Sequence, residues 1–151
     1  MIVMLENRSF DSMLGYLSLD PWAGTRPGAV DGLRTNALAT GYVNPANDGS
    51  RRAPFEVSTD DLLPSDLPHG RWEIMSQLNY DSDARKLRMD GFVRAQYPQG
   101  ATPDRPTCMG YFTPALVPMT HFLATEYRVC DRWFSAIPAD THPNRLMSLS
   151  G

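Results

Sequence analysis

The chain has two cysteines, one lysine and no long hydrophobic run. The first and the last of these features argue against a cysteine metal site and a membrane-spanning segment. Cys108 and Cys130 lie too far apart in sequence to form a Cys-x-x-Cys metal knuckle. They form one disulfide if the protein is exported, or otherwise stay as small buried thiols, which is the simpler expectation. No apolar run reaches the roughly 18 residues that cross a bilayer, so we expect no transmembrane segment. No signal peptide precedes Ile2, which leaves the localisation open, with export of a parent protein as one alternative.

Lysine is also scarce, because Lys86 is the only one among the 14 Lys and Arg residues, and 17 Asp and Glu residues give a formal net charge of −3. No basic stripe with interleaved aromatic residues occurs, so we expect no nucleic-acid partner. The composition, 42% hydrophobic and 21% charged, is ordinary for a globular domain. A chain of 151 residues is long enough to bury a core and fits one domain.

The first half of the chain begins with an apolar run, residues 2–5, which predicts a buried strand. A polar stretch follows at once, and Ser9 or Asp11 is expected to cap a short helix that ends near Leu17. Residues 20–68 then lose any regular pattern and are rich in Gly, Pro, Asn and Asp. We interpret them as a long surface excursion with one small hairpin, and disorder is the alternative.

The second half shows the periodicity of helices, followed by an apolar stretch and another helix start. The pattern predicts helices over residues 69–80 and 115–127, a short segment over 89–98, an extended strand over 127–137 and a helix from about Thr141. Pro143 fits the first turn of that last helix.

Strands separated by helices favour an α/β fold with a parallel sheet and right-handed crossovers. The loop after residues 2–5 and the loop after residues 127–137 would then open on the same edge of that sheet. We expect Trp72 and Trp133 to be core residues.

Three residues at that sheet edge, Glu6, Asn7 and Thr141, offer hard oxygen ligands. A carboxylate, an amide oxygen and a hydroxyl suit a divalent cation such as Ca²⁺, Mg²⁺ or Mn²⁺, and suit Zn²⁺ less well without histidine. A bound cation would ionise the Thr141 hydroxyl more readily and so prepare it to attack phosphorus. The plainer alternatives are a loop for Glu6–Asn7 and a helix cap for Thr141.

Other residues supply donors for a phosphate group. Asn144 and Arg145 lie at the start of the predicted helix and would donate to phosphoryl oxygens. His69 would donate to a phosphoryl oxygen or act as general acid toward a leaving group, with capping or solvent exposure as the alternative. His121 lies on an apolar helix face and is expected to be a satisfied core histidine.

Residues 3–11, Val-Met-Leu-Glu-Asn-Arg-Ser-Phe-Asp, closely resemble the opening signature of the bacterial phosphoesterase family, which contains non-specific phospholipases C and acid phosphatases. Three later segments resemble the same family in the same order: residues 69–72, residues 89–93, and residues 130–135 continuing to 141–146. The first and last segments are specific, and the middle two support them.

The resemblance implies an alkaline-phosphatase-like α/β sandwich with a mainly parallel central sheet. It also implies a metal-dependent hydrolase of phosphate esters, a phospholipid among them, that passes through a covalent phospho-enzyme. By position, Glu6 and Asn7 correspond to metal ligands, Thr141 to the nucleophile and His69 to a histidine near the phosphate. Residues 1–151 would be the amino-terminal part of one catalytic domain.

The sequence departs from the family in one respect, because it contains no Asp-rich, His-containing metal motif such as Asp-Glu-His-Gly-Gly. Glu6, Asn7 and Thr141 are few ligands for a cation that prefers about six. We therefore expect an incomplete sheet and an isolated chain that binds metal poorly and turns over slowly or not at all. The alternative function is a truncated or degenerate non-catalytic binding module.

Overall fold

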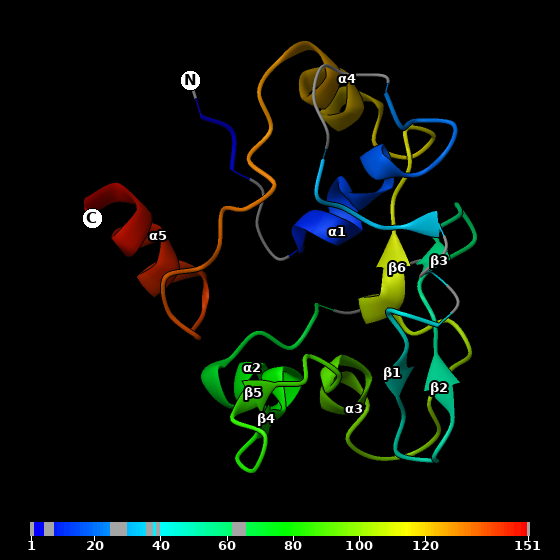
Figure 1. Ribbon diagram of the computed structural model, residues 1–151, viewed down its shortest axis with the longest axis vertical. Coiled ribbons are helices and arrows are strands. Elements are labelled where there is room, and N and C mark those ends of the chain that lie inside the picture. The colour runs from blue at the N-terminus through cyan, green and yellow to red at the C-terminus, as the bar shows by residue number, and fades with distance from the viewer. Residues whose placement is uncertain are drawn as a thin grey trace.

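The structure is a computed structural model that describes residues 2–4, 8–24, 30–35, 38, 40–61 and 66–150. Short helices and two-residue strands are joined by long loops (Figure 1). In chain order they are α1 (Phe10–Met13), η1 (Gly15–Ser18), β1 (Asn44–Pro45), β2 (Arg51–Arg52), β3 (Phe55–Glu56), α2 (Arg71–Leu78), β4 (Tyr80–Asp81), β5 (Lys86–Leu87), α3 (Phe92–Gln96), η3 (Thr107–Met109), β6 (Gly110–Tyr111), α4 (Pro118–Glu126) and α5 (Thr141–Ser150). The described part of the chain is thus α/β in composition.

The strands of the described residues form three separate pairs. β3 and β6 are parallel, with Phe55 opposite Gly110, whereas β1–β2 and β4–β5 are antiparallel. The hairpin predicted within residues 20–68 is confirmed as β1–β2. Residues 55–56 of the same excursion pair with a strand about 55 positions later. Parallel strands require such a long connection.

Two small hydrophobic clusters form the core, and the β3–β6 pair lies between them. The first cluster packs the α1–η1 region against α4 through Tyr16, Leu17, Leu19, Leu33 and Ala124, with Tyr111 of β6 at its edge. The second contains Ala46, Val93 and Met109, with Phe55 of β3 and Cys108 packed against them. The parallel pair therefore contributes one side chain to each cluster and connects them.

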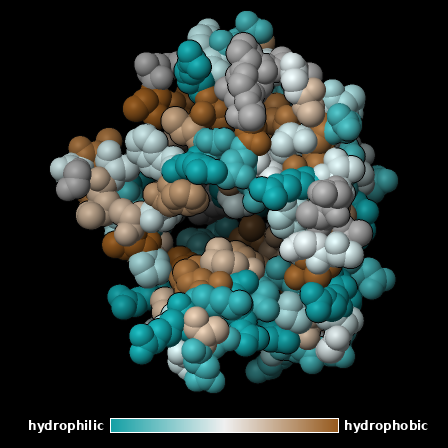
Figure 2. All heavy atoms as spheres, in the orientation of Figure 1, coloured by the Kyte–Doolittle hydropathy of each residue, from teal (hydrophilic) through white to brown (hydrophobic). Residues whose placement is uncertain are grey.

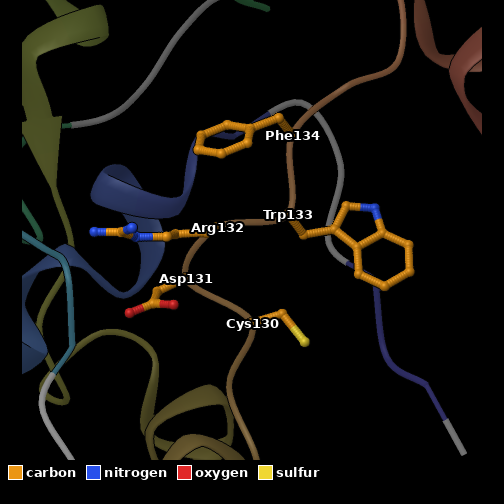
Figure 3. A pocket seen from close by; sticks show the side chains of 5 residues that line it. All are labelled: Cys130, Asp131, Arg132, Trp133 and Phe134. Atoms are coloured by element: carbon orange, nitrogen blue, oxygen red, sulfur yellow. The ribbon is translucent and has the colours of Figure 1, made fainter.

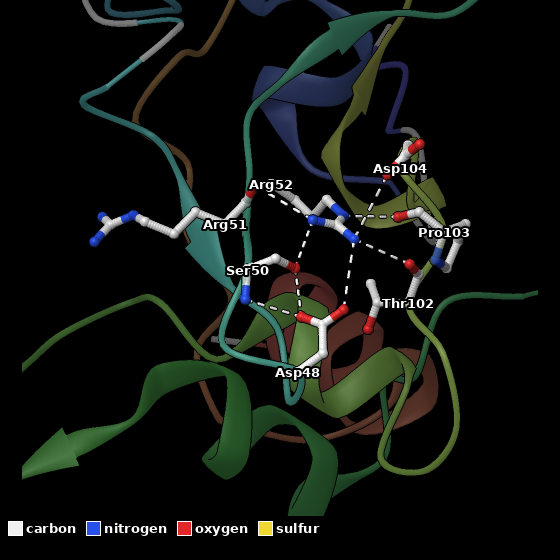
Figure 4. A network of polar contacts seen from close by, with 7 residues as sticks. All are labelled: Asp48, Ser50, Arg51, Arg52, Thr102, Pro103 and Asp104. Carbon is white, nitrogen blue, oxygen red and sulfur yellow. Dashed lines mark hydrogen bonds and ion pairs between the residues drawn. The ribbon is translucent and has the colours of Figure 1, made fainter.

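A nearly buried arginine, Arg52, joins the β1–β2 hairpin to the loop before η3 (Figure 4). Its Nε donates to Pro103 O at 2.8 Å and its Nη2 donates to Thr102 O at 3.0 Å. Nη1 donates to Ser50 Oγ at 2.6 Å, and Asp48 and Asp104 lie within 3.8 Å of Nη2. Charged donors bound to carbonyl oxygens are the stronger class of hydrogen bond, so this network fixes the loop to the hairpin.

Local signals in the sequence place several helix ends correctly. The Ser9 side chain accepts a hydrogen bond from Ser12 N at 3.1 Å and so caps α1 as predicted. Pro118 occupies the start of α4, and α2 lies inside the predicted helix over residues 69–80. The short segment over residues 89–98 contains a helix, α3. The glycine of the Asp-Gly-Phe segment, Gly91, is required sterically, because a Cβ there would lie 1.9 Å from Ser76 O of α2.

The predicted strand over residues 2–5 is wrong for the part that the structure describes. Residues 2–4 have no regular structure, and Ile2 is 80% exposed. The predicted strand over residues 127–137 is also wrong, since those residues form loops and turns. A strand needs a neighbouring strand to satisfy its backbone, and no described strand pairs with either segment. The two segments nevertheless run near each other, as both Figure 1 and Figure 3 show.

Trp72 and Trp133 are 77% and 59% exposed, so the prediction that they are core residues is wrong. Figure 2 shows apolar side chains reaching the surface at several places. Helical spacing of apolar residues identifies a face that favours burial, but not whether another element covers it. No helix within the described ranges is both long and apolar enough to span a bilayer.

The two cysteines are free thiols rather than a disulfide. Burial against the second cluster raises the pKa of Cys108 to about 12. Cys130 is exposed, so the expectation of a buried thiol holds for Cys108 alone.

Candidate functional site

Thr141, the predicted nucleophile, is the first residue of α5 and follows a turn over residues 137–140. Ala139 N donates to Ile137 O at 2.9 Å, which tightens this turn. The Thr141 residue itself is half-buried. Thr141 therefore lies at a helix start, where the helix dipole favours an anion.

Asn144, one of the two predicted phosphate donors, turns back onto the same loop. Its Oδ1 accepts from Ile137 N at 3.2 Å. Its Nδ2 donates to Ile137 O at 3.1 Å, Ala139 O at 2.7 Å and Asp140 O at 3.1 Å. Arg145, the other predicted donor, is exposed on α5. Whether either contacts substrate stays a prediction.

His69 lies at the start of a second helix, α2, whose N-cap is Gly70. His69 Nδ1 is 2.7 Å from Leu67 O and 3.7 Å from Asp66 Oδ2. A carbonyl oxygen only accepts, so Nδ1 is the donor in the contact with Leu67 O. The side chain is 41% exposed, which leaves it accessible from solvent.

The two helix starts converge at Gly70. A Cβ placed on Gly70 would lie 3.9 Å from Asp140 Oδ1, next to Thr141, and 2.5 Å from Glu73 Oε2. The loop that carries His69 and the turn that carries Thr141 are therefore neighbours, although 72 positions separate the two residues.

The predicted cation site has two ligands, Glu6 and Asn7, that lie outside the described residues. Within the described ranges no group of three His, Cys, Asp or Glu residues is arranged to hold a metal ion. The carboxylates of Asp140 and Glu73 both lie next to Gly70. The His, Cys, Asp and Glu residues that the structure describes do not make up a cation site by themselves.

The segment before this turn, residues 130–134, lines an open pocket of about 460 Å³ (Figure 3). Two contacts with Asp31 hold the segment in place. Asp131 Oδ2 accepts from Asp31 N at 2.8 Å, and Arg132 Nη2 and Nε donate to Asp31 Oδ2 at 2.8 and 3.1 Å. Asp131 and Arg132 thus bind Asp31 and fix the backbone of residues 130–134. Trp133 and Phe134 in the same segment remain exposed.

Sequence reasoning missed three acidic residues of this region: Asp31, Glu73 and Asp140. Asp31 lies within an irregular stretch and meets Arg132 across 101 positions, so no local pattern indicates its role. Asp140 directly precedes the predicted nucleophile Thr141, and this adjacency in the sequence could have indicated that Asp140 lies near the site. Glu73 follows Gly70 by one helical turn, where an acidic residue stabilises a helix start.

Comparisons with known proteins all relate the chain to phosphoesterases and phospholipases C. The phosphoesterase family model matches residues 1–151. Non-specific phospholipase C1 of Arabidopsis thaliana is 33% identical over 149 residues, which is 96% of this chain and 26% of that protein. Phospholipase C A of Mycobacterium tuberculosis is 30% identical over 154 residues, covering 99% of this chain and 28% of that protein. Non-hemolytic phospholipase C of Burkholderia pseudomallei is 27% identical, covering 99% and 19%. The chain thus spans about a quarter of the length of most curated relatives it matches.

Proposed function

Because the chain belongs to the phosphoesterase family, we propose that the protein of which it forms this region hydrolyses phosphate esters. A phospholipid is the proposed substrate, since the relatives from a plant and from two bacteria are all named phospholipase C. A soluble phosphate monoester, cleaved as by an acid phosphatase, is the second substrate class. For the whole domain we propose the alkaline-phosphatase-like sandwich, of which the parallel β3–β6 pair is the supporting feature.

The observation that carries the proposal is the meeting of the Thr141 turn with the His69 loop at Gly70. The proposed step forms a bond between the Thr141 hydroxyl oxygen and phosphorus while the bond from phosphorus to the leaving alcohol oxygen breaks. The departing oxygen takes a proton from His69 Nε2, and the threonine proton passes to solvent. Water then attacks the phosphorus while the bond from phosphorus to the Thr141 oxygen breaks. One water proton passes to the Thr141 oxygen and the other stays on the departing phosphate, and His69 regains its proton from solvent.

The proposed cofactor is a divalent ion, Ca²⁺, Mg²⁺, Mn²⁺ or Zn²⁺, with Glu6, Asn7 and Thr141 as its ligands in this chain. A bound cation would lower the pKa of the hydroxyl and stabilise negative charge on the phosphoryl oxygens. Further ligands from other parts of the protein are needed to complete its coordination.

The test uses the full-length protein with p-nitrophenyl phosphate and p-nitrophenyl phosphorylcholine, each with and without a chelator. We expect release from at least one ester, loss of release with chelator, and a decrease of about a thousandfold or more in Thr141→Ala. The matched control is Thr125→Ala, because Thr125 Oγ1 donates only to carbonyl oxygens of its own helix, α4.

Acid quenching during turnover should trap phosphate on Thr141, which mass spectrometry of the peptide containing residues 141–145 would locate. Undiminished release from Thr141→Ala would refute the threonine nucleophile. Binding of either ester without any release would instead identify the non-catalytic binding module.

A further inference from the structure

The side chain of Asn144 makes four hydrogen bonds to the turn before Thr141. Its carboxamide lies among the main-chain atoms of residues 137, 139 and 140. One side chain from within α5 thus closes the loop that leads into α5. The contact with Ile137 pairs both ends of the amide with both polar atoms of one residue, since Oδ1 accepts from Ile137 N and Nδ2 donates to Ile137 O.

This arrangement leaves no spare donor on the side chain. A carboxamide nitrogen carries two hydrogens, and three carbonyl oxygens lie within 3.1 Å of Asn144 Nδ2. A phosphoryl oxygen would have to displace one of these carbonyls from Asn144 Nδ2. The geometry therefore supports a role for Asn144 in shaping the loop and not in direct contact with substrate.

We propose that Asn144 is a positioning residue that fixes the 137–140 turn and thereby sets the place of the Thr141 hydroxyl. This inference rests on the proposed phosphoesterase function. The physical reason is that Thr141 directly follows the turn, so a change in the Asp140 backbone moves the threonine. A displacement of about 1 Å in a reacting group costs on the order of a hundredfold in rate.

The experiment uses the full-length protein with three variants. Asn144→Leu keeps the branch point and the number of side-chain heavy atoms but removes every hydrogen bond of the carboxamide, and Asn144→Ala removes the side chain beyond Cβ as well. Ser148→Ala is the matched control, because Ser148 Oγ also donates to a main-chain carbonyl of α5, that of Arg145 at 2.8 Å, but has no contact with the turn.

Two measurements separate positioning from substrate contact. We expect kcat to fall on the order of a hundredfold in both Asn144 variants, with KM changed by less than about threefold. Hydrogen exchange of the Ile137 amide should accelerate by about tenfold, because that N–H loses its acceptor. Ser148→Ala should match the wild type in both measurements.

The outcomes are distinguishable from failure of the proposed function. An active wild type whose Asn144 variants raise KM alone, or leave kcat unchanged, would overturn the positioning role only. Unchanged exchange at Ile137 would overturn the loop contact itself. An inactive wild type would overturn the proposed function and the catalytic consequence together, whereas faster exchange would still assign Asn144 to the loop.

Discussion

Tyr16 has no exposed surface, and its hydroxyl oxygen lies 2.8 Å from Nδ1 of His121 on α4. The prediction of His121 as a satisfied histidine of the core face is confirmed by this bond. Trp22 packs edge-on against the Tyr16 ring, with centroids 5.4 Å apart. Burial raises the pKa of Tyr16 to about 12, because the phenolate would lose its hydration.

Tyr16 therefore links the stability of the chain to alkaline pH. The unfolded chain releases the tyrosine proton near pH 10.0, whereas the native state holds it until about pH 12. The native state thus binds more protons across that interval, and we expect the free energy of unfolding to fall as the pH rises through it. Urea unfolding followed by circular dichroism at several pH values measures this decline.

Tyr16→Phe isolates the contribution, because burial also raises the pKa of Cys108 and of Tyr111 and so gives them the same sign. The variant should show a shallower decline than the wild type, while Tyr80→Phe, at an exposed ring, should keep the full decline. Identical slopes for wild type and Tyr16→Phe would contradict the prediction.

At the scale of elements, hydrogen-bonded connections decide where the short strands lie, because a two-residue strand has little pairing of its own. Asn44 of β1 accepts from Phe92 N of α3 at 2.9 Å through its Oδ1. Thr113 Oγ1 donates to Glu56 Oε1 of β3 at 2.8 Å. Such contacts bridge sequence separations of 48 and 57 positions and do not follow from hydrophobic periodicity.

Arg52 gives the sharpest test at this scale, since its side chain is only 12% exposed. We expect Arg52→Ala to lower the free energy of unfolding by about 3 kcal/mol, because Thr102 O and Pro103 O lose a charged donor. The neighbouring Arg51→Ala is the control, because Arg51 is exposed and points away from the network in Figure 4. Its effect should stay within about 0.5 kcal/mol in the same urea titration. Equal effects of the two substitutions would show that the network adds little.

At the scale of the whole molecule, many large apolar side chains lie on the surface of the described residues. They include Ile2 at 80%, Phe134 at 79% and Leu149 at 86% exposed. α5 buries no residue, and in Figure 1 it stands apart from α1, α4 and the β3–β6 pair. Exposed apolar surface of this kind is typical of an interaction face or an association hazard.

We accordingly expect the 151-residue chain, expressed alone, to self-associate as its concentration increases. Sedimentation velocity over a range of concentrations measures the shift in mass. The triple variant Phe134→Ser, Leu146→Ser, Leu149→Ser should shift toward monomer, because these exposed residues support little of the core. A chain that stays monomeric throughout would contradict this expectation.

The family relationship was predictable from the sequence, because the motifs that indicate it are contiguous stretches of residues. Residues 3–11 and 141–146 each resemble a family motif in the order of their residues, and this resemblance is visible without knowledge of the fold. The caps and prolines at the starts of α1, α4 and α5 were predictable for the same reason, since a helix start depends on neighbours within one turn. The roles of Glu6, Asn7, His69, Thr141 and Arg145 stay predictions.

The strands and the contacts of the site were not predictable in this way. An apolar run forms a strand only beside a second strand, and the sequence of residues 2–5 or 127–137 does not indicate which strand that would be. The ring of carbonyls around Asn144, the approach of Asp140 to Gly70 and the pairing of Asp31 with Arg132 all depend on how the chain returns to itself. Local chemistry along the chain determined which family this is and where helices begin, whereas only tertiary packing decided which polar groups are consumed in holding loops, because hydrogen-bond partners are chosen by distance in space.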